Sequence, residues 1–334
     1  MTIRKGALAV VICSGARAFA GAIALVAASI AAAAFDLQGH RGARGLMPEN
    51  TLSGFAKALD IGVSTLETDL AVTRDGTLVL SHDPVLNPDI VRGPDGAWLN
   101  APAPQVHSLT LTELGRYDVG RIKPGTKYAT QFNTQEPVDG ARIPTLIELF
   151  DLVKSSGKAP RFNLETKLSP ERPHETPAPE TFVRLLVEVV RAAGVSSRAT
   201  IQSFDWRTLI AARALAPDIA TVCLTTPGTV KDRIVDGARQ PSPWLGGLDP
   251  ASFGNSLPLL AKAAGCSTWS PRFSELTPDL VAEAHAQHLK VVPWTINGPA
   301  EMARAIEMKV DGLITDYPDR ARTILTAKGI ALPP

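Results

Sequence analysis

The chain has 334 residues, of which 45% are hydrophobic and 20% charged, an ordinary globular composition that leaves room for one large domain or two small ones. Its 34 basic and 33 acidic residues give a formal net charge of +1. This balance of charges does not suggest a polyanion-binding surface, which argues against a nucleic-acid-binding protein.

The N-terminus differs from the rest of the chain. Arg4 and Lys5 precede an alanine-rich apolar run over 18–34. This layout is typical of a cleavable secretory signal peptide, with cleavage after Ala34. We therefore expect a signal peptide over 1–34, a mature domain over 35–334 that is periplasmic or secreted, and no stable membrane insertion after cleavage. An uncleaved anchor is the alternative, but the uninterrupted run is short of the ~20 residues that a membrane span needs.

Two cysteines remain after such a cleavage, Cys223 and Cys266. We place them at opposite ends of neighbouring parallel strands. That separation exceeds the ~4.4–6.8 Å between the Cα atoms of a disulfide. Free buried thiols are therefore predicted, even in an oxidising compartment.

The first 50 residues of the mature chain alternate strand and helix. An apolar run over 35–39 predicts a strand, and Asn50 or Thr51 caps a helix that follows. A second strand is predicted over 65–73. The turn at 74–76 is too short for a parallel crossover, so the run 77–82 should fold back as a hairpin partner of that strand.

The segment from about 85 to 142 interrupts this alternation. It is rich in Pro, Gly, Asp and Asn and has weak periodicity, so we interpret it as an inserted loop subdomain with too few apolar residues for a core of its own. Regular alternation of helix and strand then continues to the C-terminus. The parallel strands are predicted to start near 35, 65, 161, 199, 219, 267, 290 and 311.

Eight strands separated by helices predict a (β/α)8 TIM barrel, an α/β fold, with the insertion after the second strand and its hairpin. A doubly wound open sheet is the alternative. No glycine-rich dinucleotide fingerprint follows the first strand, which speaks against it.

Polar side chains gather where the strands of such a barrel end. His40 and Arg41 follow the first strand, Glu67 and Asp69 lie on the second, and the third ends at Glu165 and Lys167. Because side chains alternate along a strand, each pair spaced by two residues points to one face. Three carboxylates therefore converge at the C-terminal face, where barrel enzymes place their active sites.

Three buried carboxylates repel one another unless a cation neutralises them. All-oxygen ligands favour Ca²⁺ or Mg²⁺. Salt bridges from Glu67 and Asp69 to Lys167 and Arg41, without a metal, remain the alternative on these residues alone. His82, returned by the hairpin to the level of the carboxylates, adds a second imidazole suited to acid/base chemistry.

Nine short motifs follow one another along the chain: His40-Arg41-Gly42, Pro48-Glu49-Asn50-Thr51, Glu67-Thr68-Asp69, Thr73-Arg74-Asp75-Gly76, His82-Asp83-Pro84, Asn163-Leu164-Glu165-Thr166-Lys167, Gln202-Ser203-Phe204-Asp205, Trp294-Thr295-Ile296-Asn297 and Asp311-Gly312-Leu313-Ile314-Thr315-Asp316-Tyr317-Pro318. In their order and spacing, the chain resembles the glycerophosphodiester phosphodiesterase family.

The resemblance implies a TIM-type barrel that hydrolyses glycerophosphodiesters to sn-glycerol 3-phosphate and an alcohol, with one divalent cation, Ca²⁺ or Mg²⁺. By position it implies the following roles: His40 and His82 as the catalytic acid/base pair, Glu67, Asp69 and Glu165 as metal ligands, and Arg41 and Lys167 as phosphate-binding residues. Which histidine is the acid, and whether water or the glycerol hydroxyl attacks first, stay open.

Several weaker expectations complete this interpretation. Trp294 is expected to form an apolar wall against the glycerol carbons, or else to pack in the barrel. Glu49 is expected to order the first loop, Asp83 to orient His82, and the insertion to limit the alcohol group to small polar ones. Competing functions are a phospholipase-D-like hydrolase of lysophospholipids or sphingomyelin and a binding protein that does not cleave its ligand.

Overall fold

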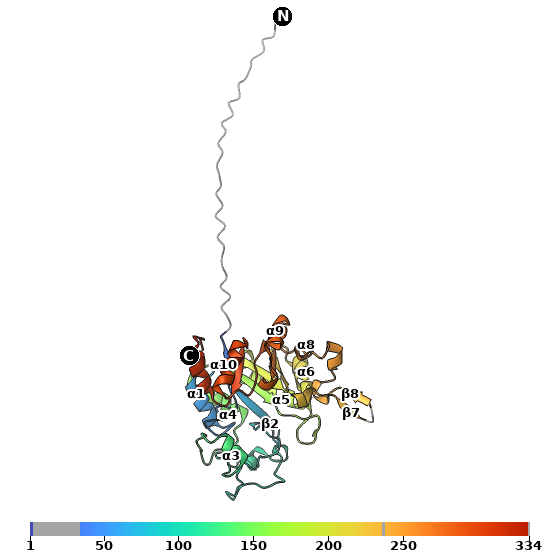
Figure 1. Cartoon of the computed structure of the whole chain (residues 1–334). Helices are drawn as coiled ribbons and strands as arrows, with labels where there is room; N and C mark the ends of the chain where they lie inside the picture. Colours follow the sequence, from blue (N-terminus) through green and yellow to red (C-terminus); the bar gives the residue numbers. More distant parts are fainter. Residues whose placement is uncertain (3–33, 236–237, 333–334) are drawn as a thin grey trace. The chain divides into compact units, whose positions relative to one another are not determined.

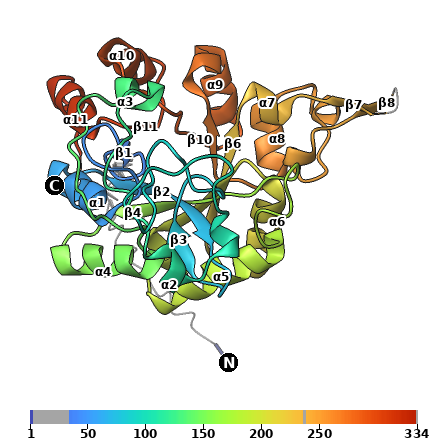
Figure 2. The ribbon, with the colours of Figure 1, turned by 90° about the horizontal axis from the view of Figure 1, so that it is seen from below.

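The computed structural model describes residues 1–2, 34–235 and 238–332, and the predicted signal peptide falls almost entirely outside them. The domain that begins at Ala34 is built around a barrel of parallel strands with helices outside it (Figures 1 and 2). Within the described ranges, no helix is both long and apolar enough to cross a membrane.

Eight parallel strands follow one another in the order β10-β9-β6-β5-β4-β2-β1-β11, and β3 pairs antiparallel with β2. Their bounds are β1 Asp36–Gly39, β2 Thr65–Val72, β3 Leu78–Leu80, β4 Arg161–Thr166, β5 Ala199–Ser203, β6 Ala220–Thr225, β9 Thr268–Pro271, β10 Lys290–Val291 and β11 Gly312–Thr315. Backbone hydrogen bonds from Asp311 N to Val291 O (2.9 Å) and from Ile314 N to Pro293 O (3.0 Å) join β10 to β11. The predicted (β/α)8 barrel with its hairpin is confirmed.

The α-helices of the barrel layer and its loops are α1 Leu52–Ile61, α4 Leu146–Ser156, α5 Pro179–Ala192, α6 Trp206–Leu215, α7 Pro227–Val230, α8 Leu257–Ala263, α9 Pro278–Ala286, α10 Pro299–Glu307 and α11 Pro318–Ala327. A short hairpin, β7 Arg233–Val235 with β8 Ala238–Gln240, projects from the loop after β6 (Figure 2). The sequence did not indicate this hairpin, because its strands are exposed throughout and lack the alternation that burial imposes.

The first turn of the barrel is shaped by glycine. Gly42 has φ +87°, and a Cβ there would lie 2.7 Å from the carbonyl carbon of Gly54. The loop can therefore lie directly against the start of α1 only with glycine at this position. Thr51 caps α1 as predicted, since its side chain accepts a hydrogen bond from Gly54 N. The loop that carries His40 is thus held against the helix that follows it.

The segment between β3 and α4 forms the predicted insertion, which contains α2 Leu111–Leu114 and α3 Lys127–Gln131. The expectation that it lacks a core of its own is wrong. Ala71 and Val79 of the hairpin pack with buried residues of the insertion and its end: Leu86, Val91, Val106, Leu114, Val119 and Ile143. These apolar residues are far apart in the sequence and show no periodicity, so only the folded chain brings them together.

Cys223 and Cys266 form a disulfide, with their Cα atoms 5.9 Å apart, and the prediction of free thiols is wrong. The barrel staggers its strands, so that Thr268 of β9 pairs with Val222 in the middle of β6. Cys266 lies in the turn between α8 and β9, where its N–H bonds to Ala261 O at 3.1 Å. Cys223 Sγ lies 3.9 Å from that same oxygen, so both side chains meet in the helix layer.

We expect this disulfide to stabilise the domain substantially. It joins residues 43 apart in the chain. Closing a loop of that size reduces the entropy of the unfolded chain and so raises the free energy of unfolding by about 4 kcal/mol at 25 °C. Urea unfolding with and without reductant measures the effect. The double variant Cys223→Ala/Cys266→Ala is the control, because its unfolding midpoint should not respond to reductant. Equal midpoints for the wild type in both conditions would contradict the expectation.

Candidate active site

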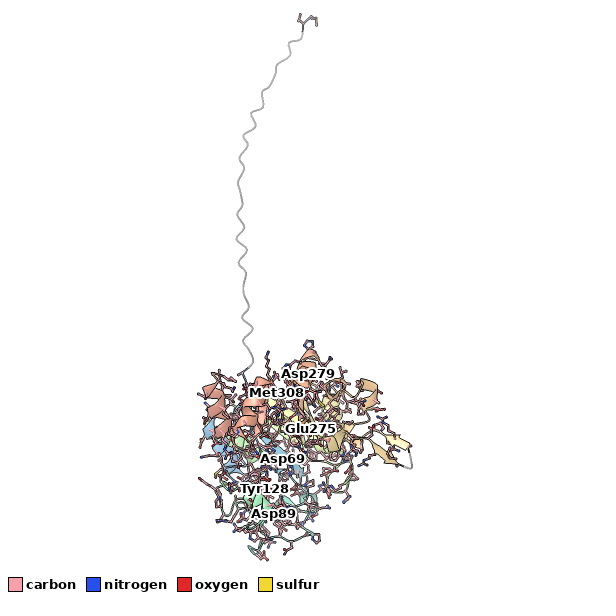
Figure 3. All side chains as sticks on the ribbon, viewed as in Figure 1. Asp69, Asp89, Tyr128, Glu275, Asp279 and Met308 are labelled. Carbon is pink, nitrogen blue, oxygen red and sulfur yellow. A yellow bond between two sulfur atoms is a disulfide. The ribbon has the colours of Figure 1, made fainter. Side chains whose placement is uncertain are left out.

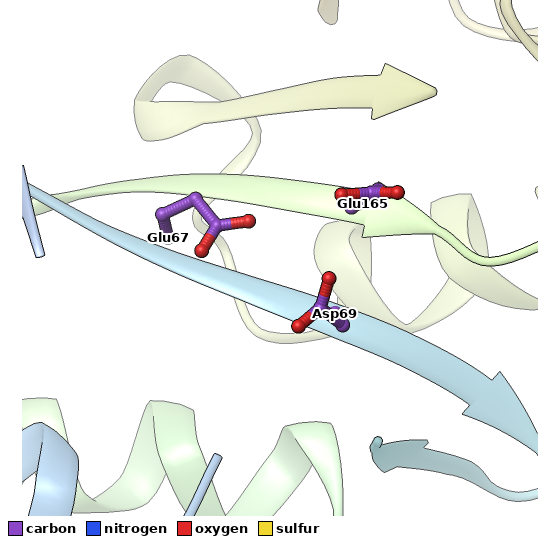
Figure 4. A group of neighbouring side chains, drawn as sticks. All are labelled: Glu67, Asp69 and Glu165. Carbon is purple, nitrogen blue, oxygen red and sulfur yellow. The ribbon is translucent and has the colours of Figure 1, made fainter. Parts of the chain in front are cut away.

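Three carboxylates form the centre of the site. Asp69 of β2 pairs in register with Glu165 of β4, and Glu67 lies two residues before Asp69. All three are buried, and each offers an oxygen within 4.8 Å of the others. Figure 4 shows Glu67 and Asp69 on one strand and Glu165 on its neighbour, with the carboxylates on one side of the sheet. The predicted convergence of these three side chains is confirmed.

Burial and neighbouring charges shift the pKa values of these three carboxyl groups in different directions. Burial and the charge of Asp69 raise the pKa of Glu67 well above its ordinary value, and burial raises that of Glu165 to about 7. Burial also opposes the ionisation of Asp69, but Arg41 and Lys167 outweigh it and hold its pKa well below the usual range. Carboxylates this close repel one another when ionised.

One oxygen of the cluster lacks a hydrogen bond. Asp69 Oδ1 is buried without a hydrogen-bond partner, although Lys167 Nζ lies 3.5 Å away. Buried polar atoms in native proteins are rarely left unsatisfied. A hard cation held by oxygens of Glu67, Asp69 and Glu165 would use this atom and cancel the repulsion. These residues therefore fit a Ca²⁺ or Mg²⁺ ion.

His40 follows the last residue of β1, and a carboxylate binds one of its ring nitrogens. Its Nδ1 lies 2.6 Å from Asp316 Oδ1, and its Nε2 lies 4.0 Å from Glu67 Oε2. Arg44 and Asn297 bind the same aspartate, at 2.8 Å and 2.7 Å. Burial and the Arg44 charge lower the pKa of His40 to about 4, although Asp316 opposes them. The imidazole is therefore neutral at pH 7 in this site.

His82 follows β3 and lines the same cavity as His40. Its Nδ1 lies 2.8 Å from Asp83 Oδ1, so that Asp83 orients the ring as predicted. Asn87 Nδ2 donates to the second oxygen of Asp83 at 3.3 Å. Burial, Arg41 and Lys167 lower the pKa of His82. Both histidines thus have one ring nitrogen fixed by a carboxylate and the other free to face the cavity.

Arg41 connects the first loop to the carboxylates. Its backbone N donates to Glu67 Oε2 at 2.9 Å, and its Nη1 donates to Glu49 Oε1 at 2.8 Å. The expected ordering role of Glu49 is therefore seen in the contacts. Tyr128 of α3 donates its hydroxyl to the other oxygen of Glu49, so the insertion supports the loop from outside. Figure 3 labels Tyr128 in the insertion.

Lys167, Phe204 and Trp294 complete the lining of the catalytic cavity. Lys167 Nζ lies 2.6 Å from Glu165 Oε1 and 5.8 Å from the centre of the Phe204 ring. Trp294 packs edge-on against Phe204, with ring centres 5.3 Å apart. The histidines, Arg41, Lys167, Glu67, Glu165 and both aromatic residues line one cavity of about 140 Å³. Trp294 therefore lines the cavity, and its expected contact with the glycerol carbons stays a prediction.

Four polar residues around the site were not singled out by the sequence. Asp316 binds His40 and is itself bound by Arg44, Gln202 Nε2 donates to Glu67 Oε1 at 2.7 Å, and Asn50 Nδ2 donates to Asp69 Oδ2 at 3.0 Å. Asn50, Gln202 and Asp316 lie inside motifs that carry the resemblance, which was the signal available. Arg44 lies just beyond such a motif, and only its contact with Asp316 shows its role.

Comparisons with known proteins agree with this geometry. Residues 40–320 match the model of the glycerophosphoryl diester phosphodiesterase family. A glycerophosphodiester phosphodiesterase of Caldanaerobacter subterraneus subsp. tengcongensis is 28% identical over 84% of this chain and 93% of its own length.

Two solved structures extend the comparison. One, a putative glycerophosphoryl diester phosphodiesterase from Silicibacter pomeroyi DSS-3, is 36% identical, with a TM-score of 0.79 over 90% of this chain and 95% of the other. Another, an Oleispira antarctica phosphodiesterase in complex with its product sn-glycerol-3-phosphate, shares the fold at 22% identity and a TM-score of 0.64, over 88% of this chain and 97% of the other. With the match over residues 40–320, the chain belongs to the glycerophosphoryl diester phosphodiesterase family.

Proposed function

We propose that the chain hydrolyses glycerophosphodiesters to sn-glycerol 3-phosphate and an alcohol, with a divalent cation at Glu67, Asp69 and Glu165. One observation carries this proposal: His40, His82, Arg41 and Lys167 line a single cavity together with Glu67 and Glu165, two members of the acidic cluster. When bound, the cation would offset the charge that builds on the phosphate oxygens in the transition state.

The cationic side chains of the site are suited to hold the phosphate. Arg41 is buried and Lys167 is half-buried, and nearby carboxylates raise the pKa of both above the ordinary values despite their partial or full burial. Both groups therefore stay charged at neutral pH. Fixed positive charges in a water-poor site stabilise a developing anion without reorganisation.

The two histidines are suited to move the protons. His40 is neutral and has Nε2 on the side of Glu67, while His82 reaches the same cavity from β3. One imidazole would take the proton from the attacking oxygen and the other would supply a proton to the departing alcohol. Either assignment, and attack by water or by the glycerol hydroxyl, is compatible with these contacts.

Asp316→Asn tests the support of His40. The carboxylate raises the pKa of His40 against burial, so its loss should lower that pKa further and move the acid limb of kcat/KM to lower pH. The imidazolium would also lose its counter-charge, and we expect kcat to fall about 10²–10⁴-fold. pH profiles at saturating Ca²⁺ or Mg²⁺ measure both effects. A lower kcat with an unmoved acid limb would indicate a purely structural role for Asp316.

A substrate panel tests the function itself. Glycerophosphocholine, glycerophosphoethanolamine, lysophosphatidylcholine and sphingomyelin are assayed with chelator and then with added Ca²⁺, Mg²⁺ or Mn²⁺. We expect cation-dependent release of sn-glycerol 3-phosphate from the first two. Preferential cleavage of the lipids would favour the phospholipase-D-like alternative, and binding without turnover would favour a non-catalytic binding protein.

We further propose that the enzyme is exported. Two observations support this: the leader pattern of residues 1–34 and the disulfide between Cys223 and Cys266, a bond that is rare in reducing cytosol. N-terminal sequencing of the protein from the cell envelope or medium should find Phe35 as the first residue. Recovery of an intact Met1 from the cytosol alone would contradict export.

A further inference from the structure

A second cavity opens beside the catalytic one. It has a volume of about 320 Å³ and shares His82, Glu165, Lys167 and Phe204 with the catalytic cavity. An occupant of this cavity would therefore reach the reacting phosphate from the His82 side. Asp83 and Pro84, which follow His82, form one part of its wall, and most of the rest comes from the loops after β4 and β6, including Leu168, Arg172, Thr226, Thr229 and Trp244.

Trp244 is held in place at the outer wall of this cavity. The next residue, Leu245, is 1% exposed and belongs to the barrel core. Ser242 Oγ donates to Thr229 O at 2.7 Å and accepts from Trp244 N at 3.3 Å. A Cβ at Gly246 would lie 2.6 Å from Ile210 Cδ1 of α6, so the turn lies directly against that helix. A side chain on such an anchored turn presents a defined surface to a ligand.

Contacts at the rim join the two loops that enclose the cavity. Trp244 Nε1 donates to Glu171 Oε1 at 3.4 Å, and Arg233 of β7 forms an ion pair with the same carboxylate. The loop after β4 and the loop after β6 therefore meet at Glu171. No residue of 85–142 lines either cavity among those described, which favours Trp244 over the insertion as the outer wall.

We propose that this second cavity receives the alcohol half of the diester and that Trp244 limits its size, so that compact alcohols such as choline and ethanolamine are preferred. The inference rests on the proposed function, because the occupant is part of the same substrate. The aromatic side chains of Phe204 and Trp244 line this cavity and suit the carbon skeleton of such an alcohol, and a methylated ammonium gains further contact energy on an aromatic ring. We expect Trp244 to hinder a bulkier cyclic polyol.

Trp244→Ala tests the assignment with three readouts. We expect KM for glycerophosphocholine to rise about tenfold, as loss of one aromatic contact implies. The ratio of kcat/KM for glycerophosphocholine to that for glycerophosphoinositol should fall. The inhibition constant of sn-glycerol 3-phosphate should not change, because this product lacks the alcohol half. Trp244→Phe should restore most of the selectivity.

Trp98→Ala is the matched control. Trp98 is a half-buried tryptophan of the insertion that packs with Arg92, and it lines neither cavity. An unchanged substrate ratio in Trp244→Ala, or equal shifts in KM and in product inhibition, would overturn the inference while leaving the proposed function intact. A wild-type chain that cleaves no glycerophosphodiester would instead overturn the proposed function, and this inference with it.

Discussion

Replacing His82 by alanine is expected to lower kcat/KM for glycerophosphocholine by about 10²–10⁴-fold, the usual contribution of a general acid or base. The ring lies at the junction of the two cavities and is oriented by Asp83. Its side chain is 33% exposed, so its removal should leave the fold intact. Steady-state kinetics and a thermal unfolding curve of the same preparation check both statements.

His288→Asn is the matched control for this variant. His288 is exposed at the end of α9 and has φ +56°, a conformation that asparagine tolerates. Its kinetics should equal those of the wild type. If His82→Ala retains native activity together with a native unfolding curve, the acid/base assignment is wrong.

A substrate with a better leaving group separates the two proton roles. An ester of sn-glycerol 3-phosphate with 4-nitrophenol needs little proton donation to its leaving group. If His82 is the general acid, His82→Ala should lose far less activity on this ester than on glycerophosphocholine. If His82 is the general base, both substrates should lose activity equally. Because His82 lies beside the second cavity, where we place the leaving alcohol, we expect it to be the general acid.

Cation binding is expected to stabilise the protein and to be required for activity. At a free concentration of 100 Kd, Ca²⁺ or Mg²⁺ should raise the free energy of unfolding by about 2.7 kcal/mol, and chelation should abolish turnover. Because the proposed site shares the ion among Glu67, Asp69 and Glu165, Glu165→Gln should weaken both effects strongly. Thermal unfolding titrated with each cation, followed by isothermal calorimetry, measures the affinity without relying on activity.

The pH dependence of this stabilisation has a definite sign. The pKa of Glu165 is raised to about 7 from its ordinary 4.5, so without a cation its contribution to stability is present below about pH 4.5 and is lost as the pH rises to 7. A cation favours the ionised form, and its stabilising effect should therefore grow over the same range. Glu188→Gln, an exposed carboxylate on α5 paired with Arg184, should respond like the wild type. A flat response in the wild type would contradict a cation at this cluster.

Local sequence patterns were sufficient to predict the barrel and the place of its site. Alternation of strands and helices, the cap at Thr51 and the short turn at 74–76 each depend on neighbouring residues, and the structure confirms them. The pairing of Glu67 and Asp69 with Glu165 also follows from the alternation of side chains on adjacent strands. These features need no knowledge of distant contacts.

Other features depended on how the strands are staggered. The disulfide forms because β9 is shifted along β6, so that the first residue of β9 pairs with the middle of β6 and Cys266, just before β9, comes within 5.9 Å of Cys223 between the Cα atoms. No local pattern encodes that register, since it is set by closure of the whole barrel. The core of the insertion was missed for a similar reason: its apolar residues are scattered between 86 and 143 and meet only against the face of the hairpin that carries Ala71 and Val79.

The sequence by itself determined the fold class, the carboxylate cluster and the two histidines, because strand periodicity and motif spacing place these groups at one end of a parallel barrel. Only the tertiary structure decided what surrounds them. The hold of Asp316 on His40 spans 276 residues, and the bond from Trp244 to Glu171 joins loops 73 residues apart. Contacts between residues so far apart in the chain form only when the barrel closes, and no short stretch of sequence predicts them.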